Sequence, residues 1–372
     1  MNKWVQCELG DLLTFQRGHD LPKTSMIDGE YPVVGSNGII GYHNEFTTDA
    51  PSITIGRSGN VGNPFVYYGK TWSHNTTLYV KEFKNIDPVF AYYFLKTLKL
   101  DNYAGGSAVP TLNRNHIHCL TVSVPSDIET QKKIADILKN LDDKIEENNK
   151  INNNLEQQVL ALYRHTFVDD DNPNRKNCRA DEYFDITIGK TPPRKEPQWF
   201  SKNPNYITWV SISDMGNCGL YISNSSEQLT LEAVQKHNVK IVPDNTILLS
   251  FKLTVGRVAI TNGKMTTNEA IAHFKTDNKE INEYLYCYLK TFNYQTMGST
   301  SSIATAVNSK IIKGMPFVVP TNEEIVKFHS VASPMFEKIK ANQLEIANLV
   351  SLRDALLPKL LSGELDVSEI KI

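Results

Sequence analysis

The chain has 372 residues and a formal net charge of −2, with 40% hydrophobic and 22% charged residues. This balance excludes a disordered chain, and the length predicts about two domains. The near-neutral charge argues against a chain that binds nucleic acid without partners. No apolar run approaches the roughly 20 residues that a membrane-spanning helix needs, so no membrane contact is expected.

The cysteines indicate a reduced compartment. Five are scattered along the chain, at positions 7, 119, 178, 218 and 287, with no C-x-x-C pair. Neither a zinc site nor a disulfide framework is expected from this spacing. The first eight residues have no apolar core typical of a signal peptide. We therefore expect a cytoplasmic protein that binds no metal.

Two regions, 1–125 and 172–320, have the composition and residue pattern typical of α+β domains. Both are rich in aromatic and β-branched residues and are interrupted by Gly, Pro, Asn and Ser, which predicts short strands. Strands are expected at 52–55, 77–80, 246–249 and 258–260, and short helices at 89–98 and 282–291. The second region also carries a surplus of lysine and arginine, whereas the acidic surplus lies in 126–171 and 321–372.

Residues 126–167 and 322–362 are predicted to form two long helices. Their apolar positions alternate at spacings of three and four, the 3.5-residue period of a coiled-coil seam. Asn148 and Asn342 lie on these seams. The simplest packing is an antiparallel coiled coil about 60 Å long, with a domain at each end. Two amphipathic helices packed on separate cores are the alternative. In the antiparallel arrangement, the segment 126–171 is expected to be a central helix with a linker, and 321–372 a distal helix with a C-terminal tail.

An internal repeat is the strongest feature of the sequence. Residues 107–113 match 302–308, and 122–125 match 317–320, both at an offset of 195. Leu95-Lys96 matches Leu289-Lys290, and Gly62 matches Gly256, at an offset of 194. The helix seams coincide at the same offset. The order is therefore domain, helix, domain, helix, and an antiparallel helix pair would relate the two halves by a pseudo-two-fold axis.

No catalytic constellation is present among the common motifs for phosphate, dinucleotide, zinc-protease or serine-hydrolase chemistry. Asn203-Pro204-Asn205-Tyr206 resembles the Asn-Pro-Pro-Tyr motif of amino-methyltransferases, which hold a flipped adenine. Its third residue is Asn, and no glycine-rich cofactor loop accompanies it, so a turn before a strand is the simpler interpretation. We expect no cofactor.

Three features of each domain suit contact with DNA. The loop 56–62, matched by 250–257, combines glycines with Arg or Lys, which reach phosphates or guanine edges. The segment 72–76, matched by 266–269, carries Asn, which reads adenine. The glycine-serine segments 105–114 and 298–310 lead into Asn and a basic residue, and a basic cluster surrounds Pro192-Pro193. Hairpin turns, ordinary strand ends, flexible connectors and a solvated charged face are the alternative interpretations.

The candidate DNA-contacting residues are Arg57, Ser58, Asn60, Trp72, His74, Asn75, Ser107, Asn113 and Arg114 in the first domain, and Lys190, Arg194, Lys195, Lys252, Thr254, Arg257, Asn268, Ser302, Asn308 and Lys310 in the second.

The helices resemble a known family. Val124-Pro125 followed by 129–138, 141–145, 149–152 and 155–156, together with Phe167-Val168-Asp169, is similar to the central conserved region of type I restriction–modification specificity subunits. Residues 332–339 and 352–364 resemble the distal repeat of that family. One departure is that the first domain starts almost at Met1. The C-terminal helix would then supply the second half of the dyad, in a circular arrangement.

The resemblance implies a non-catalytic subunit whose two target-recognition domains each read one half of a bipartite, asymmetric site in double-stranded DNA. It implies assembly with two adenine-methylating modification subunits and, in the nuclease form, with restriction subunits. The helices would set the spacing between the half-sites and dock the modification subunits. Two alternatives remain, a self-contained adenine methyltransferase that uses Asn203–Tyr206 and a coiled-coil scaffold that binds no DNA.

Overall fold

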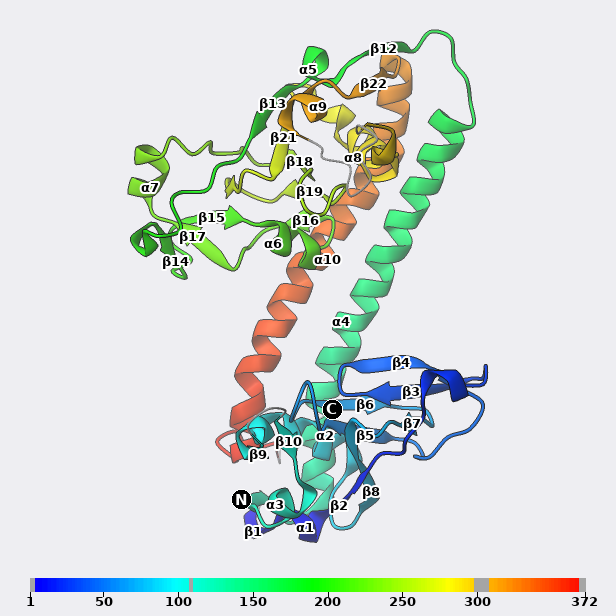
Figure 1. The fold of residues 1–372 in the computed structure, drawn as a ribbon, viewed down its shortest axis with the longest axis vertical. Coiled ribbons are helices and arrows are strands. Elements are labelled where there is room, and N and C mark those ends of the chain that lie inside the picture. The colour runs from blue at the N-terminus through cyan, green and yellow to red at the C-terminus, as the bar shows by residue number, and fades with distance from the viewer. Residues whose placement is uncertain (1–3, 107–109, 298–307, 368–372) are drawn as a thin grey trace. The chain divides into compact units, whose positions relative to one another are not determined.

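The computed structural model describes residues 4–106, 110–297 and 308–367 (Figure 1). The chain forms two compact units, the first made of residues 1–146 and 347–372 and the second of residues 147–346. Their boundary runs through two long helices, α4 (Ile128–Tyr163) and α10 (Asn322–Ser362). Each unit therefore contains one globular α+β domain and a part of both helices. The predicted long helices are confirmed, and the first ends in a single π-helical turn, Arg164–Val168.

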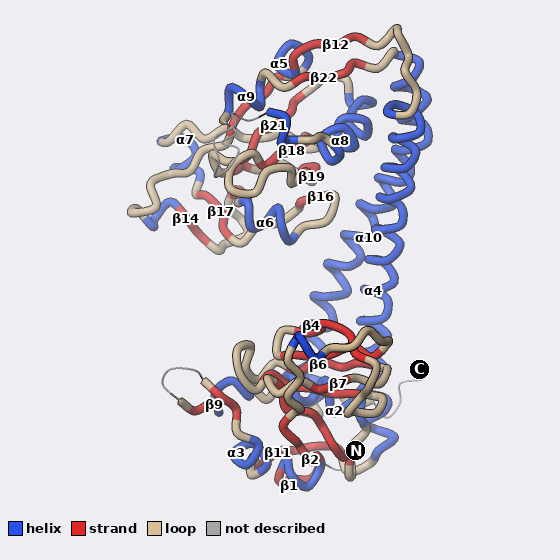
Figure 2. The backbone as a smooth tube through the Cα atoms, turned by 45° about the vertical axis from the view of Figure 1, so that its right-hand side comes forward, coloured by secondary structure: helices blue, strands red, loops and turns tan. Residues whose placement is uncertain are grey.

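The first domain is built from short strands and short helices, as Figure 2 shows by colour. A four-stranded sheet has the order β2-β8-β5-β6, a three-stranded sheet the order β4-β3-β7, and β1 pairs with β11 and β9 with β10. The elements are β1 (Trp4–Glu8), α1 (Leu9–Leu12), β2 (Leu13–Arg17), β3 (Tyr31–Gly35), β4 (Gly38–His43), β5 (Ser52–Gly56), β6 (Pro64–Tyr67), β7 (Trp72–Ser73), β8 (Thr77–Phe83), α2 (Pro88–Thr97), β9 (Ala104–Gly105), β10 (Thr111–Leu112), α3 (Arg114–His118) and β11 (Thr121–Pro125).

The second domain follows the same plan with additions. Its sheets have the orders β13-β21-β18-β19-β16 and β14-β17-β15-β20, and β12 pairs with β22. The elements are β12 (Lys176–Arg179), α5 (Ala180–Tyr183), β13 (Asp185–Ile188), β14 (Phe200–Ser201), β15 (Ile207–Val210), α6 (Ile212–Asn217), β16 (Tyr221–Ile222), β17 (Glu227–Leu229), α7 (Leu231–Lys236), β18 (Ile247–Ser250), β19 (Val258–Thr261), β20 (Thr266–Thr267), β21 (Ile271–Lys275), α8 (Asn282–Thr291), α9 (Ser309–Lys313) and β22 (Pro316–Val319).

The predicted duplication is visible in backbone pairing as well as in sequence. Cys7 pairs with Val122 in the first domain, and Cys178 pairs with Phe317 in the second. The offset between equivalent residues is therefore 171 at the first strand (7 to 178) and 195 at the last (122 to 317). The difference arises mostly between β15 and β18, where α6, β16, β17 and α7 stand in place of the single strand β4.

Buried aromatic residues on α2 and α8 hold each domain together. Phe90 and Phe94 of α2 are almost fully buried, and Tyr284 and Tyr288 occupy the same positions of α8. Each fully buried side chain of this size contributes about 1.5–3 kcal/mol. The two tyrosine hydroxyls also donate to backbone carbonyls of β22, at 2.7 and 2.8 Å. Helix α8 therefore anchors the closing strand of the second domain.

The two long helices run antiparallel, because residues successively later in α4 contact residues successively earlier in α10. In the first unit Arg353 Nη1 donates to Asp142 at 2.7 Å. In the second unit Asn342 Nδ2 donates to Asn152 Oδ1 at 2.8 Å, and Asn148 Nδ2 donates to Glu345 at 3.0 Å. Both seam asparagines are buried, at 2% and 1% exposure. Polar pairs at such positions favour one register over others.

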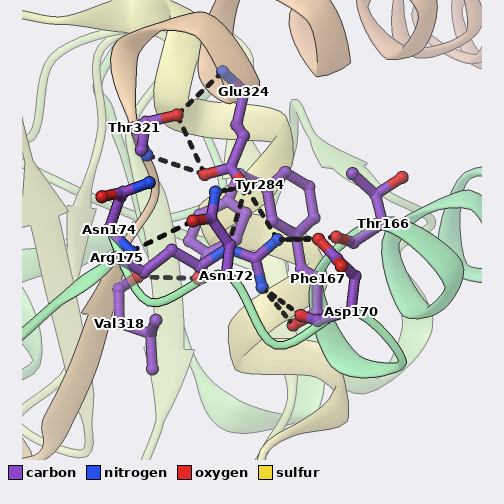
Figure 3. A network of polar contacts seen from close by, with 10 residues as sticks. All are labelled: Thr166, Phe167, Asp170, Asn172, Asn174, Arg175, Tyr284, Val318, Thr321 and Glu324. Atoms are coloured by element: carbon purple, nitrogen blue, oxygen red, sulfur yellow. Dashed lines mark hydrogen bonds and ion pairs between the residues drawn. The ribbon is translucent and has the colours of Figure 1, made fainter.

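A largely buried ion pair fixes the start of α10 in the second unit (Figure 3). Arg175 is 7% exposed in its side chain and donates from Nε and Nη2 to Glu324 Oε1 at 3.0 and 2.8 Å. It also donates to the carbonyls of Thr166, Phe167 and Asp170. Burial alone would raise the pKa of Glu324, but hydrogen bonds from Arg175, Asn172 and Thr321 outweigh it and lower the pKa to about 2. One guanidinium thus joins the end of α4, the linker and α10.

Candidate nucleic-acid interface

The basic, glycine-containing loops are turns of equivalent β-hairpins. The first tip loop (Gly56–Gly62) connects β5 to β6, and the second tip loop (Ser250–Gly256) connects β18 to β19. The Gly62 N–H donates to the Gly56 carbonyl at 2.8 Å, and the Gly256 N–H donates to the Ser250 carbonyl at 3.0 Å. Both closing glycines have positive φ, +81° and +92°, which disfavours any side chain there. The hairpin interpretation is confirmed, and it leaves the outer residues of both loops available for a ligand.

The three candidate features of the first domain lie together. Arg57 is half-buried, and its backbone N–H donates to the Thr76 carbonyl at 2.8 Å. Its carbonyl accepts from the Leu112 N–H at 2.8 Å, and Ser58 forms an isolated antiparallel β-bridge with Thr111. Residues that the sequence separates by up to 55 positions are therefore gathered around Arg57. Among the described residues, the contact given for its Nη1 is a long one, 3.4 Å to the Asn75 carbonyl, so the described part of the chain holds the guanidinium weakly.

The 72–76 segment is more deeply built into the domain than the sequence suggested. Trp72 packs edge-on against His43 at 5.0 Å between ring centroids, so it acts as a packing residue. His74 Nδ1 lies 3.1 Å from Thr76 Oγ1, and burial lowers the pKa of His74 below its usual value, which keeps the ring neutral at pH 7. Asn75 donates to Asp20, and the amide of Asn60 accepts from Asn63.

In the second domain, some candidate residues are exposed and others form hydrogen bonds within the domain. Lys252 and Thr254 are exposed on the second tip loop. Arg257 points back into the domain, where its Nη1 donates to the Ile212 carbonyl at 2.6 Å. Asn268 Oδ1 accepts from the Ala270 N–H at 3.1 Å and so shapes a turn.

The basic cluster around Pro192-Pro193 is divided in the same way. Lys190 and Lys195 have exposed side chains. Arg194 pairs with both carboxylate oxygens of Glu227, at 3.0 and 2.8 Å, and stacks over the rings of Phe200 and Trp209 at 4.1 and 4.6 Å. Arg194 is therefore engaged within the domain through Nη1 and the face of its guanidinium, although its side chain is still 50% exposed.

The two asparagines that the repeat singled out are helix caps. Asn113 Oδ1 accepts from the Asn115 N–H ahead of α3, and Asn308 Oδ1 accepts from the Ile311 N–H ahead of α9, both at 3.0 Å. Asn is among the preferred N-cap residues, so helix capping accounts for both. Arg114 and Lys310, in the first turns of these helices, are exposed. Ser107 and Ser302 lie outside the described residues.

Leu253, which is not among the residues predicted from sequence, is 97% exposed at the tip of the second loop. The sequence alone could have drawn attention to this position, because the repeat aligns Leu253 with Gly59 at the offset of 194.

The methyltransferase-like segment forms a turn. Asn203 Oδ1 accepts from the Asn205 N–H at 3.0 Å, and the Asn203 carbonyl accepts from the Tyr206 N–H at 3.1 Å, directly before β15. The amide that would hold an adenine is thus used locally. Among the described residues no cluster of His, Cys, Asp and Glu could hold a metal ion, and no helix is long and apolar enough to span a bilayer.

Comparison with known proteins assigns the chain to a family. It matches the family model for the type I restriction modification DNA specificity domain over residues 1–157 and 175–347. It is 26% identical over 333 residues to the HindI specificity subunit of Haemophilus influenzae, covering 69% of this chain and 71% of that one. It is 28% identical over 326 residues to the MjaIX specificity subunit of Methanocaldococcus jannaschii, covering 77% and 73%.

A solved structure shares the fold. The crystal structure of the S subunit of a type I restriction–modification system from M. genitalium superposes with a TM-score of 0.65 at 17% identity, covering 97% of this chain and 96% of that one. Nothing in the geometry of Asn203–Tyr206 favours the methyltransferase alternative. The chain belongs to the type I restriction–modification specificity subunits and serves as a DNA sequence-specificity subunit.

Proposed function

We propose that the domains at 1–125 and 172–320 each read one half of a bipartite, asymmetric DNA site. The observation that supports this is the pair of tip loops, which have the same closing hydrogen bond but different exposed residues. A shared frame with different outer side chains is what two readers of different sequences require. In the first domain the reading group is centred on Arg57, with Ser58, Asn60 and Arg114. In the second it is Lys190, Lys195, Lys252, Thr254 and Lys310.

We further propose that partners supply much of the attraction to phosphates. The whole chain has a net charge of −2, whereas affinity for DNA depends mainly on neutralised phosphates. The exposed acidic residues of α4, such as Asp143, Glu146 and Glu147, suit docking to basic faces of two modification subunits. Restriction subunits would join in the nuclease form. Native mass spectrometry of the co-expressed complex should show two modification subunits for each copy of this chain.

The test of the half-site assignment uses the complete complex with its modification subunits. The target is first mapped by methylome sequencing, and duplexes are then made with either half scrambled. Arg57→Ala should weaken binding through the first half only, and Lys252→Ala through the second only. A lost base contact costs about 1–3 kcal/mol and relaxes one position, whereas a lost phosphate contact lowers the salt slope by about one.

The chain offers matched controls at the opposite ends of the hairpin strands. Lys70 and Lys264 are equivalent exposed lysines in the turns that follow β6 and β19. Their alanine variants should bind both halves normally. Unchanged affinity and salt slope in Arg57→Ala and Lys252→Ala would place the tip loops away from DNA.

We also propose that the antiparallel helices set the spacing between half-sites. Four residues inserted after Asn153 add roughly 6 Å, while B-DNA advances about 3.4 Å per base pair along one strand. The favoured spacer should lengthen by one or two base pairs, because a four-residue stutter nearly preserves the seam. A one-residue insertion should do worse, since it rotates the following residues by about 100°. An unchanged spacer after the four-residue insertion, seen by methylation mapping, would restrict the helices to docking.

A further inference from the structure

Leu253 lies at a loop position where the backbone is in the left-handed conformation in both domains. Its φ is +60°, and its equivalent in the first domain, Gly59, has a φ of +85°. The left-handed conformation is unfavourable for residues with a side chain, and glycine is the usual choice there. The second domain nevertheless keeps a leucine, whose side chain is 97% exposed.

The base of the loop is fixed, so this exposure is not that of a loose segment. Ser250 Oγ donates to the Thr254 carbonyl at 2.6 Å and accepts from the Arg257 N–H at 3.0 Å. Phe251 is 1% exposed and its N–H donates to the Ala270 carbonyl at 2.9 Å. These bonds hold both sides of the tip, and Leu253 is carried outward on it.

The neighbours of Leu253 indicate what covers it. Lys252 and Thr254, on either side, are exposed and can reach a phosphate and a sugar or phosphate oxygen. A single exposed leucine needs no explanation by itself. Here, however, exposure coincides with a strained backbone, and such strain concentrates at functional sites. A cation and a hydroxyl around one apolar tip match a duplex surface, where charged phosphates surround apolar base stacks.

We propose that Leu253 is an apolar wedge that inserts between stacked base pairs in the half-site of the second domain. This proposal rests on the proposed function, because it requires the second tip loop to face DNA. Proteins that deform DNA use leucine among their wedge residues, partly unstacking a base step and kinking the duplex. Gly59 has no side chain to insert. The geometry therefore assigns the wedge to the second half-site and leaves the first half-site stacked at the matching loop.

The experiment measures binding and base stacking in the complete complex. Duplexes carrying the mapped target contain 2-aminopurine at single positions of either half, because its fluorescence rises when its neighbours unstack. The wild-type complex should raise the fluorescence at one step of the second half and leave the matching step of the first half unchanged. Leu253→Ala should abolish the rise and weaken binding about tenfold, since it removes most of a buried leucine contact.

Leu253→Gly separates the wedge from protein stability. This variant removes the side chain and also relieves the left-handed strain, so the second unit should be at least as stable as in the wild type. Its DNA binding should nevertheless fall as in Leu253→Ala. Leu231→Ala, which truncates another exposed leucine of the same unit (61% exposed), should change neither readout.

Four outcomes decide whether the wedge, and with it the position of the loop at the DNA, is correct. Loss of the fluorescence rise in both Leu253 variants supports the wedge. An unchanged rise and affinity in these variants, with weaker binding by Lys252→Ala, overturns the wedge and keeps the loop at the DNA. No change in any of the three variants overturns both. The wedge would also be overturned if the Leu253 variants bound more weakly but the wild-type complex gave no fluorescence rise. The leucine would then touch only a base edge.

Discussion

The two tip loops solve the same structural problem in different ways. In the first, a Cβ on Gly56 would lie 1.7 Å from the Asn60 carbonyl oxygen, so only glycine fits. In the second, Ser250 stands at the equivalent position, and its hydroxyl donates to the equivalent carbonyl, that of Thr254, at 2.6 Å. The closing backbone bond is nevertheless the same in both. The backbone frame is thus the duplicated part, and the side chains around it have diverged.

The starts of the two long helices differ in the same manner. Asp127 accepts from the Thr130 N–H and hydroxyl at the start of α4, at 3.0 and 2.9 Å. At the start of α10 the roles are reversed, because Thr321 Oγ1 accepts from the Glu324 N–H and the carboxylate reaches back to the Thr321 N–H. Only the second start has a glutamate in position to bind Arg175. This difference predicts that the two units respond differently to the same kinds of change.

The largest effect is expected from Arg175→Met. It leaves the partly buried Glu324 without its cation and three carbonyls without their donor. Breaking a fully buried ion pair costs about 3–5 kcal/mol, and we expect a loss toward the lower end of that range because Glu324 keeps 14% side-chain exposure. Hydrogen–deuterium exchange of the full chain should show faster exchange in peptides of the second unit, with peptides of the first unit unchanged. Arg179→Ala, which removes an exposed pair with Asp181, should change neither unit. Equal losses in both units would refute the local role of Arg175.

Acid should weaken the same network. The pKa of Glu324 is about 2 in the folded chain, below its ordinary value of 4.5. A carboxylate with a lowered folded pKa adds stability above its unfolded pKa and loses it as the pH falls toward the folded pKa. Urea midpoints of the wild type and Glu324→Gln should therefore converge between pH 4.5 and about 2. A constant difference across this window would show that the Glu324 charge does not stabilise the unit.

A smaller effect is expected when the residue of the second loop is placed in the first. Gly56→Ser puts a Cβ against the Asn60 carbonyl, and such overpacking costs about 1–3 kcal/mol. Peptides around the first tip loop should exchange faster, and binding through the first half-site should weaken. Gly69→Ser is the matched control, because no atom lies within 4 Å of a Cβ there. Normal exchange in Gly56→Ser would mean that the first loop can adopt the geometry of the second.

The reverse change should have the smallest effect. Ser250→Gly removes one hydroxyl, which leaves the Thr254 carbonyl and the Arg257 N–H without this partner and costs about 1 kcal/mol. No clash is created, so the hairpin should persist. Faster exchange confined to peptides that contain Arg257 would agree with this expectation. A loss as large as that of Gly56→Ser would contradict the view that the frame, rather than the serine, holds the loop.

The elements and the duplication could be predicted from sequence because they depend on local periodicity and constant spacing. The short helices at 89–98 and 282–291 match α2 (Pro88–Thr97) and α8 within one residue. The first third of the repeat was not found, since the offset changes from 171 to 194, mostly where α6, β16, β17 and α7 replace the single strand β4. Register shifts of this kind hide similarity between short strands.

The candidate site was less predictable because it depends on partners distant in sequence. Arg194 and Arg257 are of a residue type that often contacts DNA. In the structure, however, Arg194 donates to Glu227 and Arg257 donates to the Ile212 carbonyl. No pattern of neighbouring residues in the sequence predicts these long-range hydrogen bonds. The capping roles of Asn113 and Asn308 could have been found, because each asparagine directly precedes a short helix.

Domain exchange tests the central claim most directly. Residues 1–125 are replaced by the matching domain of a related specificity subunit, the chain is expressed with its modification subunits, and the methylated sites are mapped across the host genome. If each domain reads its own half, the exchange should replace one half-site and leave the other half and the spacer unchanged. A chimera that alters both half-sites together, or that keeps the original first half, would contradict the account.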